Sequence, residues 1–155
     1  MNVQIKIHQA TVDNLIKKIN AYEKGLDRKV EQATAEAAIE VQKEAKLAAP
    51  TGVSGDLRSR ISVSRHYKPA IISYIVGVHL AYAAAVEFGS GPHKPPIKPL
   101  KLWAKRKLGD ENAAYAVRNK IAKEGTRPQP FLRPAYRKVV PEYKRALKRI
   151  LRSAK

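Results

Sequence analysis

The feature that most constrains the fold is a stripe of apolar residues that recurs every three or four positions for almost forty residues. The stripe consists of Val12, Ile16, Ile19, Tyr22, Leu26, Val30, Ala33, Ala37, Val41, Ala45 and Ala48. This spacing places the side chains on one face of an α-helix. Thr11 is a suitable N-cap, and Pro50 ends the pattern because the residue before a proline avoids the helical region. The sequence therefore predicts a long amphipathic helix over residues 11–49, with Gly25 as its weak point.

The region after this helix, residues 57–89, favours a small antiparallel sheet. Strand-like composition over 57–63 and 71–78, with a turn-forming connection at 67–70, predicts a hairpin. Residues 81–88 are predicted as a third strand that runs into a turn at Gly89. Their alanines leave a short helix open as the alternative.

The rest of the chain predicts helices separated by proline-rich segments. Residues 90–125 indicate a loop and a helical insert, with helices over 99–108 and 112–122. A proline-stiffened segment begins at residue 127 and leads into a last helix that ends near 152, with Pro134 in its first turn. The expected fold is a single α+β domain of 155 residues, in which the two long helices pack on the small sheet.

Charge is strongly unbalanced and unevenly distributed. Lysine and arginine number 31 against 13 acids, a net charge of +18, of which residues 1–50 carry only +1 and residues 127–155 carry +9. Such a field attracts nucleic acid or an acidic protein surface. The candidate positions facing DNA or a partner are Arg58, Arg60, Arg137, Lys138, Lys144, Arg145, Lys148 and Arg149. An ordinary solvated helix face is the alternative for those in the last helix.

Little in the sequence supports catalysis or a bound cofactor. The chain has no cysteine, which excludes disulfides and thiolate chemistry, and its four histidines form no metal-binding pattern. A lone Glu87 beside Phe88 is more often a structural hydrogen-bond acceptor than a catalytic base. No apolar run approaches the roughly 20 residues of a membrane span. We therefore expect no enzyme, no metal, no cofactor and no membrane partner, with synthesis in the cytosol.

Three stretches of the chain carry a family resemblance. The first is Ala49-Pro50-Thr51-Gly52 followed by Gly55-Asp56-Leu57-Arg58, the second is Tyr82-Ala83 followed by Val86-Glu87-Phe88-Gly89, and the third is residues 128–135, PQPFLRPA. In order and spacing they resemble the phage tail-component family whose type member is the tenth gene product of the HK-type lambdoid phage. The motif residues are Pro50, Thr51, Gly52, Leu57, Tyr82, Glu87, Phe88, Gly89, Pro130, Phe131, Leu132, Arg133 and Pro134.

The resemblance implies a structural virion protein of a long-tailed phage. Such a tail-completion or head–tail joining subunit forms a homo-oligomeric ring, often sixfold. The implied ring lies at the head–tail junction between the head connector and the tail tube or terminator proteins, with the genomic DNA passing through it. A free, non-specific nucleic-acid-binding protein is the alternative, and it depends on charge alone. The insert over 92–126 departs from short family members and is a candidate added contact surface.

The motifs also have a physical interpretation. Thr51 and Gly52 suit a turn between helix and sheet, and Gly89 suits a backbone conformation that other residues resist. Phe88 is expected to be buried at the end of the sheet. Phe131 and Leu132, held between prolines, form a stiffened apolar anchor. It docks either on the chain's own sheet or on a neighbouring subunit.

Overall fold

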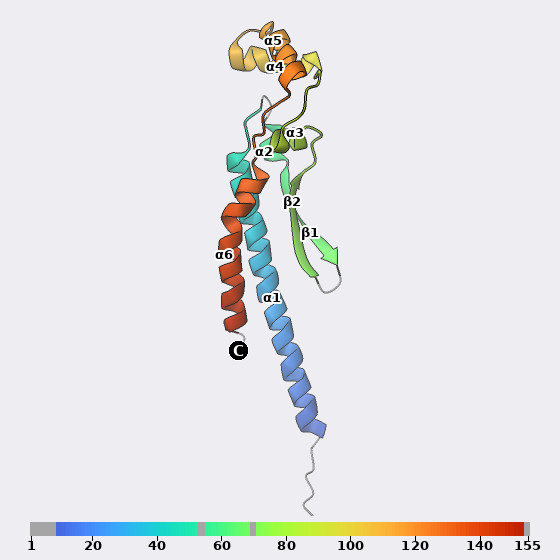
Figure 1. Cartoon of the computed structure of the whole chain (residues 1–155). Helices are drawn as coiled ribbons and strands as arrows, with labels where there is room; N and C mark the ends of the chain where they lie inside the picture. The colour runs from blue at the N-terminus through green and yellow to red at the C-terminus, as the bar shows by residue number, and fades with distance from the viewer. Residues whose placement is uncertain (1–8, 53–54, 69–70, 154–155) are drawn as a thin grey trace, which may run out of the picture.

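The computed structural model describes residues 9–52, 55–68 and 71–153, and it has the expected α+β architecture (Figure 1). The elements are α1 (Gln9–Ala48), α2 (Asp56–Ser59), β1 (Ile61–Lys68), β2 (Ile71–Val78), α3 (Ala83–Phe88), α4 (Ile97–Leu108), α5 (Ala113–Glu124) and α6 (Leu132–Arg152). The predicted long helix, hairpin, helical insert and C-terminal helix are therefore all present.

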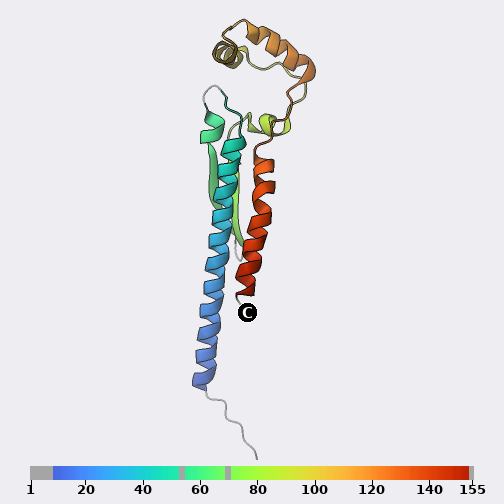
Figure 2. The same ribbon diagram turned by 90° about the vertical axis from the view of Figure 1, so that its left-hand side faces the viewer.

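The two long helices, α1 and α6, lie side by side and run in opposite directions (Figures 1 and 2). Two contacts show the antiparallel order. The earlier residue of α1, Thr34, contacts the later residue of α6, with Oγ1 3.0 Å from Tyr143 Oη, and the later residue of α1, Glu44, contacts the earlier one, with Oε2 2.7 Å from Lys138 Nζ. The alanine-rich second half of α1 lets the neighbouring elements approach closely. Ala45 in α1 is completely buried as a result.

The β1–β2 hairpin packs against the same half of α1 and completes the core. The pairing of Ile61 with Val78 and of Val63 with Val76 turns one face of the hairpin toward the helices. The buried core consists of Val41, Ala45, Ala49, Leu57, Ile61, Ala83, Phe131, Ala135 and Val139. It lies where α1, α6, the hairpin and α3 meet, at the end of the molecule where α1 finishes.

Three local predictions are wrong. The segment before Phe88 is the helix α3 and not a third strand, because its alanines favour the helical alternative. Residues 56–59 form the single helical turn α2, so the first strand begins at Ile61. The long helix begins at Gln9, which places Thr11 inside the first turn and not at the N-cap.

The helices α4 and α5 pack on each other in a lobe at one end of the molecule, apart from the α1–α6 pair (Figures 1 and 2). Ala104 and Ala114 are fully buried at their contact. The base of the lobe is closed by Ser90 and Thr126, whose backbones exchange two hydrogen bonds of 3.1 and 2.9 Å. This lobe corresponds to the predicted insert.

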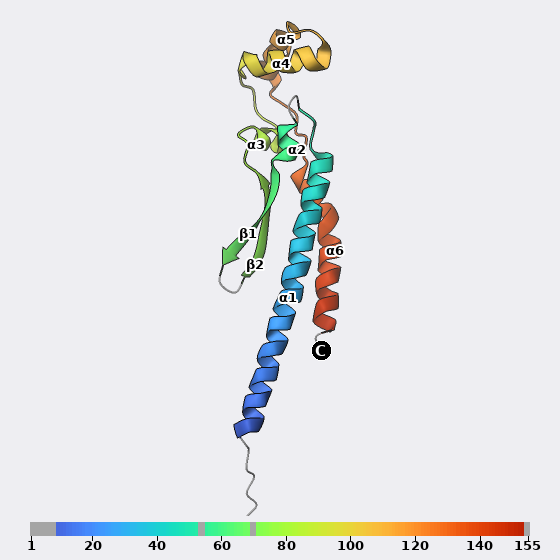
Figure 3. The ribbon, with the colours of Figure 1, turned by 180° about the vertical axis from the view of Figure 1, so that it is seen from behind.

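At the opposite end α1 extends alone. Its 40 residues span about 60 Å, whereas the 21 residues of α6 span only about 32 Å. In all three views the first turns of α1 project beyond the C-terminal end of α6 and beyond the hairpin (Figures 1 to 3). We call residues 9–24 of α1 the arm.

Candidate functional site

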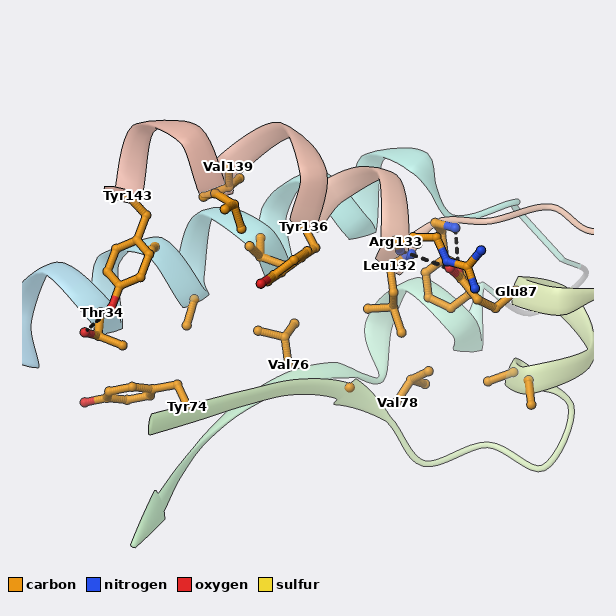
Figure 4. A pocket seen from close by; sticks show the side chains of 18 of the residues that line it. Thr34, Tyr74, Val76, Val78, Glu87, Leu132, Arg133, Tyr136, Val139 and Tyr143 are labelled. Carbon is orange, nitrogen blue, oxygen red and sulfur yellow. Dashed lines mark hydrogen bonds between the residues drawn. The ribbon is translucent and has the colours of Figure 1, made fainter. Parts of the chain in front are cut away.

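The buried carboxylate of Glu87 joins two of the family motifs. Its Oε2 accepts hydrogen bonds from the backbone N–H groups of Phe131 and Leu132 at 2.7 and 2.9 Å, and its Oε1 accepts one from Arg133 at 3.0 Å (Figure 4). These N–H groups belong to the N-cap and first turn of α6, where a helix has no internal acceptors. Glu87 is therefore a structural acceptor, as the sequence suggested.

Electrostatics favour the ionised form of Glu87. Burial of the side chain, which is 6% exposed, raises the pKa of the carboxyl, because a charged group loses solvation. The three N–H donors and the nearby Arg133 guanidinium outweigh burial, so the pKa of Glu87 lies below its usual value. A negative charge is also favoured at a helix N-terminus. The ionised Glu87 of α3 therefore stabilises the contact between α3 and the first turn of α6.

Gly89 and Phe131 fix the chain on either side of this contact. Gly89 has a φ of +77°, and a Cβ there would lie 2.6 Å from the carbonyl oxygen of Thr126, which explains the glycine. Gln129 N–H donates to the carbonyl of Val86 at 2.7 Å. Phe131 is fully buried in the chain's own core, the first of its two expected docking places.

The prediction that Phe88 is buried is wrong, since 63% of it is exposed. The reason is the helical conformation of α3, in which successive side chains point about 100° apart. Glu87 points toward α6, and the ring of Phe88 lies at the surface with the Arg133 guanidinium 5.3 Å from its centre.

The first motif holds the other helix end in place. Arg58 Nε donates to the carbonyl of Ala49 at 2.9 Å. This bond satisfies one of the carbonyl acceptors that have no partner within the helix at the end of α1. Arg58 lies in α2 and Arg60 directly after it, so neither is the strand arginine expected from the sequence. Leu57 is buried in the core beside them. We call these contacts of Arg58, Glu87, Gly89 and Phe131 the motif joint.

The remaining motif residues surround the motif joint. Pro50 is half-buried and Thr51 and Gly52 are exposed in the connection from α1 to α2, where a turn was expected. Tyr82 is half-exposed at the start of α3, and burial and the nearby Asp56 raise its pKa. Leu132 packs against the core, and Pro130 and Pro134 are exposed on either side of the first turn of α6.

The six basic residues of α6 that were predicted to face DNA or a partner divide into two groups. Lys138 pairs with Glu44 of α1, and Arg145 and Arg149 both pair with Glu142. By contrast, no ion pair joins Arg137, Lys144 or Lys148 to another described residue, and all three are exposed. Their spacing of seven and four residues places them on one face of the helix. This face is the part of the predicted basic surface that remains available to a polyanion.

An apolar groove of about 640 Å³ runs between β2 and α6 above the second half of α1 (Figure 4). Its walls include Tyr74, Val76 and Val78 of β2 and Leu132, Tyr136 and Tyr143 of α6. Thr34 lies at one end and Glu87 of α3 lies at the other (Figure 4), and Ala84 and Phe88 of the same short helix also line the groove. The groove was not predicted, because it exists only where three elements distant in sequence come together.

Other contacts of the motif joint were also missed. Sequence could have suggested that a carboxylate cap was needed for α6, since no side chain caps it locally, but not that Glu87 supplies it.

Within residues 9–52, 55–68 and 71–153, no three histidine or acidic side chains gather as metal ligands. Among the described helices, none is long and apolar enough to cross a membrane.

Comparison with known proteins identifies the family. The family model described as "Bacteriophage HK97-gp10, putative tail-component" matches residues 13–89, which include most of α1, the hairpin and α3. No curated protein and no solved structure matches the chain. The match ends at Gly89, immediately before the α4–α5 lobe, and it contains two of the three motifs. Residues 13–89 therefore resemble the HK97-gp10-like family, whose description is that of a bacteriophage "putative tail-component", and this match supports a structural tail-component role.

Proposed function

We propose that this protein is a tail-completion or head–tail joining subunit. In this proposal, copies of the chain form a hexameric ring at the head–tail junction of the virion. The ring lies between the head connector and the tail tube or terminator proteins, and the genomic DNA passes through it. The observation that carries the proposal is the family match over residues 13–89, whose Glu87 also holds the first turn of α6.

The motif joint supports an architectural role. The charged groups of Glu87 and Arg58 bind backbone atoms of their own chain, and Phe131 fills the core. A carboxylate with three N–H donors is occupied in holding two elements together and is poorly placed to act on a substrate. Residues that lock helix ends suit a subunit whose shape must be rigid when neighbours assemble on it.

The charge distribution supports a DNA path. Helix α1 has seven basic and seven acidic residues, so the net charge of +18 comes from the rest of the chain. The exposed Arg137, Lys144 and Lys148 make one face of α6 basic. A ring that turns this face inward would meet the phosphates of any sequence, because such contacts are electrostatic and non-specific.

Antibody labelling of virions tests the position. Gold-labelled antibodies against this protein should mark the head–tail junction in negative-stain images, and virions incubated with an unrelated antibody give the background. Label along the tail tube, at the tail tip or on the capsid would overturn the proposal.

Removal of the gene gives an independent test. A lysate without the protein should contain DNA-filled heads and finished tails that are not joined, and added purified protein should restore joining. Intact infectious particles made without the protein would contradict a joining role.

A further inference from the structure

The arm presents half-exposed apolar side chains and projects beyond the other described elements. Ile16 and Tyr22 are 50% and 51% exposed, although they continue the apolar stripe that packs on α6 and the hairpin farther along α1. In Figures 1 to 3 no other element lies beside these turns. An amphipathic helix gains most of its stability by packing its apolar face. The arm therefore lacks a partner in the single chain.

The groove between β2 and α6 is a concave apolar surface, which is complementary to the projecting apolar side chains of the arm. Its volume of about 640 Å³ is lined mainly by apolar side chains, among them valine, leucine and tyrosine. Tyr136 at its rim is 60% exposed. Burying this apolar surface against apolar side chains of another molecule would be favourable.

The arm is long enough to cover the groove. The α6 wall from Leu132 to Tyr143 extends for about 17 Å, and the arm, residues 9–24, extends for about 22 Å. They cannot meet within one chain. The second half of α1 forms the floor of the groove from Thr34 to Val41, and the arm continues the same helix away from it.

Charge also favours a second copy as the occupant. Two chains of net charge +18 repel each other over most of their surfaces. The arm is close to neutral, with Lys17, Lys18 and Lys24 opposed by Asp13 and Glu23. It is therefore a part of the chain that can approach another copy with little electrostatic cost.

We propose that the arm of one copy docks in the groove between β2 and α6 of the next copy. The contact joins two different surfaces, so repetition around an axis produces a ring when the rotation closes. This inference rests on the proposed ring and specifies how its subunits are joined. The apolar anchors are Ile16 and Tyr22, and the receiving walls are β2 and α6.

Single-cysteine variants test the contact directly, since the chain has no cysteine of its own. Lys18→Cys, one helical turn before Tyr22, labels the arm without removing an anchor, and Thr34→Cys and Ala84→Cys label the two ends of the groove. Each variant carries a tag of different length, and the arm variant is mixed with a groove variant before a short bismaleimide is added. We expect a product with one chain of each length from at least one groove position. Lys148→Cys, exposed on α6 outside the groove lining, is the matched control and should give little product.

Several outcomes distinguish a failure of arm docking from a failure of the proposed ring. Crosslinks between two arm variants, without arm-to-groove product, would overturn docking and indicate that arms pair with arms. A protein that stays monomeric and uncrosslinked at high concentration would overturn it as well. Arm-to-groove crosslinks in a closed dimer, measured by light scattering, would support docking but contradict the ring of the proposed function.

Charge substitution in the arm gives a second measurement. Ile16→Glu with Tyr22→Glu should weaken self-association by roughly a hundredfold, since each buried anchor contributes about tenfold or more. Thermal unfolding of the monomer should change little, because both side chains are half-exposed in the single chain. Lys17→Ala with Lys24→Ala, on the side of the arm that faces away from the apolar stripe, is the control and should associate normally. Equal loss of association in both pairs would contradict the proposal.

Discussion

The motif joint and the arm lie at opposite ends of the same helix and differ in almost every respect. At the motif joint, helix ends are capped by Arg58 and Glu87, and Phe131 is fully buried. In the arm, Ile16 and Tyr22 are half-exposed. The family motifs thus mark where the chain is fixed to itself. The exposed apolar stripe of the arm marks where the chain has a surface available to bind another molecule. Stability should therefore depend on one end, and assembly on the other.

The largest effect on stability is expected for Phe131→Ala. Removing a fully buried phenylalanine should lower the free energy of unfolding by about 3–5 kcal/mol, because a cavity remains in the core. Tyr22→Ala in the arm should change it by less than about 0.5 kcal/mol, as is usual for surface positions. Urea denaturation of the monomer measures both. Similar losses in the two variants would remove the contrast between the ends.

The next effect is expected for Glu87→Gln, which keeps the shape of the side chain and removes its charge. The variant loses charge-assisted hydrogen bonds to the first turn of α6 and should lose about 1.5–3 kcal/mol of stability. Glu40→Gln, at an exposed ion pair of α1, is the matched control and should lose less than about 1 kcal/mol. Urea denaturation at neutral pH compares the two.

The same residue predicts how stability depends on pH. The pKa of Glu87 is lower in the folded state than in the unfolded chain, so the unfolded chain binds its proton first as pH falls. Its contribution should be present above the ordinary glutamate pKa of about 4.3 and should be lost as pH falls through the lowered value. Denaturation curves between pH 7 and acid should therefore converge for wild type and Glu87→Gln. Parallel curves would contradict this account.

Gly89→Ala should be somewhat less severe. The positive φ of Gly89 is unfavourable for alanine by about 1–3 kcal/mol, and the added Cβ would also press on the carbonyl of Thr126. Gly52→Ala is the control, because a Cβ there has no neighbour within 4 Å and its φ is not in the left-handed region. Thermal unfolding of both proteins measures the difference. An unchanged midpoint for Gly89→Ala would show that the backbone adapts without cost.

Sequence predicted the elements well where the pattern was long and periodic. The stripe from Ile16 to Ala48 determined α1, and the strand-like residues up to Val78 determined the hairpin. It failed at residues 56–59 and 83–88, because segments of four to six residues take the conformation that tertiary contacts favour. Helical α3 turns Glu87 inward and Phe88 outward, so the error in conformation also produced the error about Phe88.

The candidate site was predicted in part. The motif residues were identified, and the structural role of Glu87 was anticipated, but its partners lie more than forty residues away in the chain. Such contacts follow from how α3 and the first turn of α6 are brought together. The groove was missed for the same reason, since β2 and α6 contribute its walls from positions far apart. Charge counts located basic segments but not which cations were already paired, as Lys138 is with Glu44.

The smallest effect concerns Gly25, which lies where the arm joins the rest of α1. A Cβ at this position would have no neighbour within 4 Å, and the residue is inside α1, so Gly25→Ala should stabilise the helix by about 0.5–1 kcal/mol. Since the arm is not packed in the monomer, the gain should appear as slower hydrogen exchange of arm amides and not as a higher global unfolding midpoint. A stiffer arm should also bind at least as tightly, because less ordering accompanies docking. Weaker association of Gly25→Ala, with exchange slowed as expected, would mean that the helix must bend at Gly25 to reach the groove of the next copy.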